Sequence, residues 1–106
     1  MESVDLSSKG VRVLLDAVEM FVPWKEVIQI YGWLLKTPVG DVVYLTFVHE
    51  SGHALEVHND MNGWERLLNT LADYVPAIVV DVPLKMGLLS ENGEAVVFFA
   101  KESMSN

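Results

Sequence analysis

The residues of this chain with the clearest chemical potential are the five from His49 to His53, which read His-Glu-Ser-Gly-His. On a helix, two histidines four positions apart share one face. They can then bind one Zn²⁺ while the glutamate between them activates a water molecule. Here the five residues lie between segments 42–48 and 54–57, which are rich in β-branched and aromatic residues, and Ser51-Gly52 favours a tight turn. We therefore expect the tip of a β-hairpin, where the zinc-protease pattern loses its meaning.

Two registers are open for this hairpin. A two-residue loop, Ser51-Gly52, places His49 opposite Ala54 and turns the two histidines to opposite faces of the hairpin. A three-residue loop from Glu50 to Gly52 gives the glycine the left-handed conformation that suits it and places His49 opposite His53. We favour the second register because it separates apolar from polar side chains better.

In the favoured register, His49 and His53 are cross-strand neighbours that could hold an adventitious metal ion weakly. A zinc site needs three or four ligands, and Glu56 and His58 alternate away or lie far along the strand. We therefore predict no metal site and no cofactor at this position.

Other patterns typical of enzymes are missing from the sequence. There is no Gly-x-Ser-x-Gly elbow, no phosphate-binding loop and no dinucleotide fingerprint, and the chain has no cysteine. We therefore predict no catalytic residues and no enzyme activity. Two alternatives stay open. One is a zinc-dependent hydrolase that uses His49, Glu50 and His53. The other is a binder of small apolar ligands, with a cavity between sheet and helix lined by Trp33, Leu67 and Leu71.

Composition indicates one acidic domain over residues 1–106. Half of the 106 residues are hydrophobic (51%), which is enough for a single core, and 15 acidic residues against seven basic ones give a net charge of −8. The basic residues are scattered, whereas nucleic acid requires clustered cations. No apolar run reaches the roughly 20 residues of a membrane span, and the N-terminus lacks a secretory signal. We expect a cytoplasmic protein with no nucleic-acid or membrane partner and a frayed tail at 101–106.

Hydrophobic periodicity predicts an α+β fold: an antiparallel sheet or partly open barrel packed against one main helix. A first hairpin is expected over residues 3–15 with its turn at 7–10, and residues 16–21 could add a strand. A short helical turn is expected at 23–27 because proline is favoured at a first helical position. Further strands are expected at 28–36, 42–48, 53–58 and 95–100, with a turn at 90–94 before the last. Residues 77–82 are interpreted as a strand or an extended crossing, and 83–89 stay undecided.

The main helix is predicted at about 62–75 because Trp64, Leu67 and Leu71 fall on one helical stripe. Asn62 is the expected N-cap, with Glu65 three residues later completing a capping box, and Asp60 is the alternative cap. Pro76 is expected to end the helix.

Three segments make the chain resemble small uncharacterised bacterial proteins with a pleckstrin-homology-like build. They are Val22-Pro23-Trp24-Lys25-Glu26-Val27, the strand-to-helix entry from Val57 to Trp64, and the turn and strand from Asn92 to Phe99. The resemblance implies an antiparallel sheet with one packed helix, and it brings no catalytic residues. Relatives usually carry proline at the position of Asn62.

Taken together, these observations predict a non-catalytic interaction module. The apolar run around Tyr31, Trp33 and Leu35 is a candidate interface, with Trp33 expected to be the most exposed tryptophan. The expected partner is a protein, in an immunity-like or adaptor role, and the acidic surface suits a basic partner. A homodimer is also expected.

Overall fold

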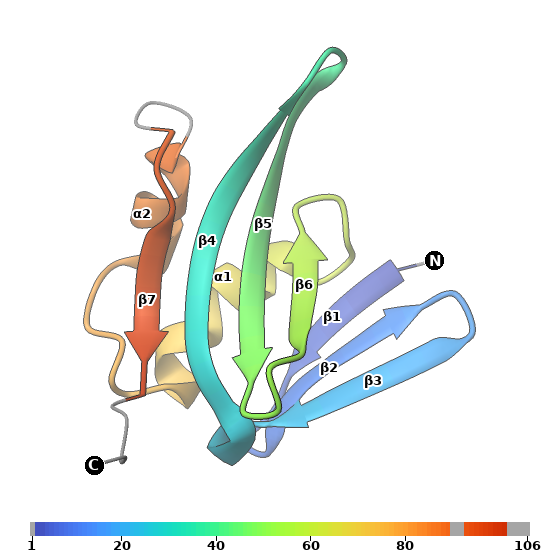
Figure 1. Ribbon diagram of the computed structural model, residues 1–106, viewed down its shortest axis with the longest axis vertical. Helices are drawn as coiled ribbons and strands as arrows, with labels where there is room; N and C mark the ends of the chain where they lie inside the picture. Colours follow the sequence, from blue (N-terminus) through green and yellow to red (C-terminus); the bar gives the residue numbers. More distant parts are fainter. Residues whose placement is uncertain (1, 90–92, 102–106) are drawn as a thin grey trace.

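The computed structural model describes residues 2–89 and 93–101, which form two antiparallel sheets and two α-helices (Figure 1). The elements in chain order are β1 (Glu2–Leu6), β2 (Gly10–Leu15), β3 (Val18–Pro23), a 3₁₀ turn η1 (Trp24–Glu26), β4 (Val27–Thr37), β5 (Gly40–His49), β6 (Ala54–His58), α1 (Trp64–Tyr74), α2 (Val82–Gly87) and β7 (Val96–Ala100). The predicted α+β class with antiparallel sheets is confirmed. Both sheets are open and do not close into a barrel.

The first sheet has the strand order β1-β2-β3. Its first turn begins where the sequence predicts it, since the Ser7 N–H donates to the Gly10 carbonyl at 3.0 Å. The strand that residues 16–21 could add is β3, which pairs along the whole of β2. The helical turn expected at 23–27 is η1, which leads the chain from the first sheet into the second.

The second sheet has the strand order β6-β5-β4-β7. Thr46 pairs with Glu56 and Phe47 with Leu55, while the His49 N–H donates to the His53 carbonyl at 2.7 Å. Gly52 has a φ of +98°, the left-handed conformation. The favoured three-residue loop is therefore confirmed, and the five residues of the zinc-protease pattern form the end of a strand and a turn.

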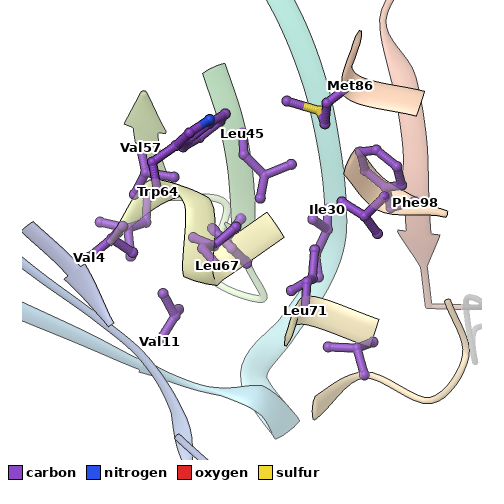
Figure 2. Packing of buried hydrophobic residues seen from close by; sticks show 14 of the residues in the cluster. Val4, Val11, Ile30, Leu45, Val57, Trp64, Leu67, Leu71, Met86 and Phe98 are labelled. Carbon is purple, nitrogen blue, oxygen red and sulfur yellow. The ribbon is translucent and has the colours of Figure 1, made fainter. Parts of the chain in front are cut away.

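The hydrophobic core lies between the two sheets and α1. Figure 2 shows Ile30 and Leu45 of the second sheet beside Leu67 and Leu71 of α1, and each of these four side chains is at most 1% exposed. Val4 and Val11 bring the first sheet into the same cluster. The predicted helical stripe is confirmed, because the buried residues of α1 are Trp64, Leu67 and Leu71.

The predicted start of the main helix at Asn62 is wrong. The N-cap is Gly63, at a φ of +92°, and no side chain caps the helix. The reason is tertiary: the backbone of Asn62 pairs with β1, where it donates to the Glu2 carbonyl at 3.0 Å and accepts from the Val4 N–H at 2.8 Å. A residue held beside a strand in this way cannot also begin a helix.

The structure shows what forms at 77–82 and 83–89, the two segments for which the sequence makes no single prediction. Residues 83–89 include most of α2, whose N-cap Asp81 accepts from the Leu84 N–H at 3.1 Å, while 77–81 cross without forming a strand. The turn expected at 90–94 lies outside the described residues except for its last two positions. Of the tail expected to fray, Lys101 is described, and its backbone N–H donates to the Ile28 carbonyl at 2.8 Å.

Candidate functional site

One face of the four-stranded sheet lies opposite the core, and we call it the outer face. Successive side chains of a strand point to opposite sides, so the strand positions between the core residues carry this face. Both helices lie on the core side: α1 passes behind β4 and β5 in Figure 1, and Met86 of α2 meets the core side of Gly32. The outer face is formed by Gln29, Tyr31, Trp33 and Leu35 of β4, Val42, Tyr44, Thr46 and Val48 of β5, Ala54, Glu56 and His58 of β6, and Val97 and Ala100 of β7.

A stacked aromatic pair stands at the centre of the outer face. Trp33 and Tyr44 are cross-strand partners whose rings lie 4.4 Å apart at an angle of 11°. The indole Nε1–H of Trp33 donates to Oγ1 of Thr46 at 2.9 Å. Thr46 is fully buried although it belongs to the outer face. The tryptophan is therefore held in one orientation by a stack and by a hydrogen bond to the buried threonine.

The aromatic row continues to the edge of the sheet and reaches the first sheet. The ring of Tyr44 meets His58 edge-on, with centroids 5.9 Å apart. Nδ1 of His58 accepts from the Asp60 N–H at 3.3 Å, so the ring proton lies on Nε2, which is 3.0 Å from Oε1 of Glu2. The row from Trp33 to Glu2 thus joins three neighbouring strands to β1.

The three residues predicted as an interface all lie on the outer face. Leu35 is 43% exposed, and Val97 of β7, which pairs with Tyr31, is 56% exposed. We expected Trp33 to be the most exposed tryptophan. Its side chain is partly buried, as is that of Trp24, because one face of its ring stacks on Tyr44. Sequence reasoning missed Tyr44, Thr46 and His58, although the alternation of β5 could have placed Tyr44 and Thr46 on the face of Trp33.

The outer face is apolar at its centre and acidic at one edge. Glu56 is exposed on β6 directly beside Thr46, and the carboxylate of Glu2 lies next to His58. None of the strand positions that form this face, as defined above, holds lysine or arginine. Lys36 occupies a strand position of the other face, opposite Asp41. The outer face is therefore acidic, as is the whole chain.

His49 is engaged by two neighbours. Its Nδ1 accepts from the Ser51 N–H at 3.0 Å and lies 2.8 Å from the Ser51 hydroxyl. Its Nε2 lies 2.7 Å from Oε1 of Glu26, in η1, and both side chains are about two-thirds buried, with 27% and 32% exposed. Since Nδ1 accepts, the ring proton lies on Nε2 and is donated to the glutamate.

This arrangement decides what the pattern from His49 to His53 can do chemically. Both ring nitrogens of His49 already have partners, so no free lone pair faces His53 to hold a metal ion. Among the described residues, no three histidine, aspartate or glutamate side chains form a group able to hold a metal ion. The order Ser51–His49–Glu26 matches a nucleophilic triad, but the Nδ1 lone pair that would take the serine proton also accepts the Ser51 amide.

Trp33, Leu67 and Leu71, which were expected to line one apolar cavity, do not line a common cavity. Trp33 lies on the outer face, whereas both leucines are packed in the core at 1% and 0% exposure. The three side chains are on opposite sides of the sheet and line no common space.

Comparisons do not add a family to these observations. No protein-family model, no curated protein and no solved structure matches the chain. Neither helix in the described ranges is long and apolar enough to cross a membrane. The geometry of the outer face and of the two histidine contacts therefore carries the functional argument.

Proposed function

We propose that this chain is a non-catalytic protein-binding module that docks its partner on the outer face. The observation that carries the proposal is an apolar and aromatic sheet face with both helices on its other side. Antiparallel sheets with one solvated face normally place polar residues there. Here seven apolar or aromatic side chains larger than alanine occupy it: Tyr31, Trp33, Leu35, Val42, Tyr44, Val48 and Val97. Contiguous patches of this kind, with aromatic centres, are typical of interaction sites.

The charge of the chain supports a basic partner. Glu56 and Glu2 stand at one edge of the outer face, and the net charge is −8. An acidic edge beside an apolar centre steers a cationic surface toward the site and raises its association rate. An immunity-like protein that neutralises a basic partner, or an adaptor, is the role that fits this surface.

A second copy of the chain is the rival occupant of the outer face. Each copy has a net charge of −8 over the whole chain, so two copies repel one another as they approach. We therefore propose a basic partner in preference to a homodimer. Sedimentation equilibrium tests the choice, since a stable dimer that Leu35→Glu dissociates would assign the outer face to self-association.

The experiment uses a photoreactive phenylalanine analogue at position 35, and the same analogue at position 79 as the control. Leu35 is 43% exposed on the outer face, and Val79 is 90% exposed on the crossing between α1 and α2. A protein from the native host that crosslinks to position 35 and not to position 79 is then purified. The proposal expects it to bind the unmodified chain directly.

Two variants then test where and how this purified partner binds. Leu35→Glu should weaken binding by at least about tenfold, and Glu56→Lys should weaken it and reduce its dependence on salt. Val79→Glu should bind like the original chain. An acidic partner, or equal binding by Leu35→Glu and Val79→Glu, would refute the proposal.

A further inference from the structure

A small apolar pocket opens on the core side of the four-stranded sheet, away from the outer face. It has a volume of about 250 Å³ and lies between η1, the end of α1 and β7. Its floor includes Val27 and Ile30, which are 2% and 0% exposed. Trp24, Tyr74 and Phe99 also line it. The pocket shares no lining residue with the interface proposed above.

The aromatic wall is held in place by contacts outside the pocket. The indole Nε1–H of Trp24 donates to the Ser7 carbonyl at 2.7 Å, and its backbone N–H donates to the Lys9 carbonyl at 3.1 Å. Its ring lies nearly parallel to Tyr74, with centroids 6.1 Å apart at an angle of 16°. A wall fixed in this way favours binding because little side-chain freedom is lost when a ligand enters.

Two local irregularities keep the space open. The pairing of β4 with β7 shifts after Ile30, so that Ile30 stands opposite Phe99 while Tyr31 stands opposite Val97. The bulge therefore turns Phe99 toward the pocket. On the other side, α1 ends at Tyr74, and Pro76 and Ala77 continue along the rim. A helix cannot pass through proline without losing a hydrogen bond, so no further turn of α1 fills the pocket.

One basic side chain lines the pocket, in a chain that is acidic overall. Lys25 lines the pocket, and Nζ of Lys101 donates to the Lys25 carbonyl at 3.1 Å. The neighbouring carboxylate of Glu26 is engaged by His49 at 2.7 Å. Lys101 therefore places a second ammonium group beside the backbone of Lys25, and Lys25 is the one charged residue among the described residues that line the pocket.

We propose that this pocket binds a small carboxylic acid with one apolar group, either a short acyl chain or a single aromatic ring. Its volume is below the roughly 300 Å³ at which typical small-molecule pockets begin, so the ligand must be small. The apolar group would displace water from the floor and the aromatic wall. The carboxylate would remain at the opening, where the ammonium groups of Lys25 and Lys101 attract it.

Titration calorimetry with octanoate and with its neutral counterpart octanol tests this assignment. The acid should bind at least about tenfold more tightly than the alcohol, and the difference should shrink at high salt. The double variant K25Q/K101Q should bind octanoate no more tightly than octanol. Both of these lysines are exposed, so the double variant should fold, which thermal unfolding checks.

Ala77→Phe tests the location, because Ala77 is an exposed residue at the rim and a phenyl ring there would occupy the opening. It should abolish the binding of octanoate, while Val79→Phe, two positions away, should leave it unchanged. Thermal unfolding checks that both variants fold. If Ala77→Phe does not fold, the double variant K25Q/K101Q tests the pocket instead.

The proposal is overturned if octanoate does not bind at millimolar concentration, if octanol binds as tightly, or if Ala77→Phe binds octanoate like the original chain. Leu35→Glu, on the outer face, should bind octanoate normally. Failure of the docking proposal and failure of this one are therefore separate outcomes.

Discussion

Nε2 of His49 lies 2.7 Å from Oε1 of Glu26, and this contact fixes the hairpin tip of β5 and β6 against η1. The Glu50 N–H also donates to the Glu26 carbonyl at 2.9 Å, so one residue of η1 accepts from the hairpin through both its side chain and its backbone. His58 makes the same kind of contact with Glu2 at 3.0 Å. Each histidine lies at the end of its strand and contacts a glutamate of a distant segment. The His49 contact connects the second sheet to η1, and the His58 contact connects it to β1 of the first sheet.

We expect His49 and Glu26 to be energetically coupled. Replacing either residue with alanine should lower the free energy of unfolding, and a double-mutant cycle in urea should give a coupling of about 1 kcal/mol. The control pair, His58 and Glu2, should give less, because Glu2 is more exposed, at 44% against 32%. A coupling near zero for His49 and Glu26 would show that the contact contributes nothing to stability.

We expect zinc to have no specific site at His49 and His53. Both nitrogens of His49 are engaged, so a metal ion would have to break its contacts with Ser51 and Glu26 first. Untagged protein, dialysed against zinc and then separated by gel filtration, should retain much less than one zinc per chain by elemental analysis. One equivalent of zinc that is lost in the His49→Ala variant would contradict this expectation.

Gly63 and Gly52 form a matched pair for separating backbone strain from steric clash. Their φ values are +92° and +98°, but a Cβ on Gly63 would lie 2.1 Å from the Val4 carbonyl oxygen, whereas one on Gly52 would meet no atom within 4 Å. Gly52→Ala should cost about 1 kcal/mol of unfolding free energy. Gly63→Ala should cost at least about 3 kcal/mol, because β1 or α1 must also move. Equal costs in urea denaturation would show that the close approach of β1 is not rigid.

The hydrogen bond between Trp33 and Thr46 should contribute to stability on the outer face. In Thr46→Val, the indole N–H loses its acceptor at a partly buried position, and the free energy of unfolding should fall by about 1 kcal/mol. Thr70→Val is the control, since Thr70 is a partly buried residue of α1 whose hydroxyl donates to the Arg66 carbonyl in an exposed contact. It should change the free energy by less than about 0.5 kcal/mol. A similar loss in both variants would assign the effect to the substitution itself.

The sequence alone determined the local features, because each depends on residues that are close along the chain. The period of two in 42–48, with glycine at position 52, predicted the hairpin and favoured the register that forms, although a second register stayed open. The stripe of Trp64, Leu67 and Leu71 predicted the buried face of α1. The same local features argue against a helical zinc motif at 49–53. Backbone propensity and hydrophobic period are sufficient for such features.

The tertiary structure decided which distant residues meet, and this could not be predicted from the spacing. Asn62 has the side chain of a helix cap, yet its backbone pairs with β1, some 60 residues earlier, and Gly63 caps the helix instead. Glu26 and Glu2 become partners of histidines 23 and 56 residues away. The outer face exists only because both helices return to one side of the sheet. Such contacts depend on the free energy of packing the whole chain, which no single segment of the sequence encodes.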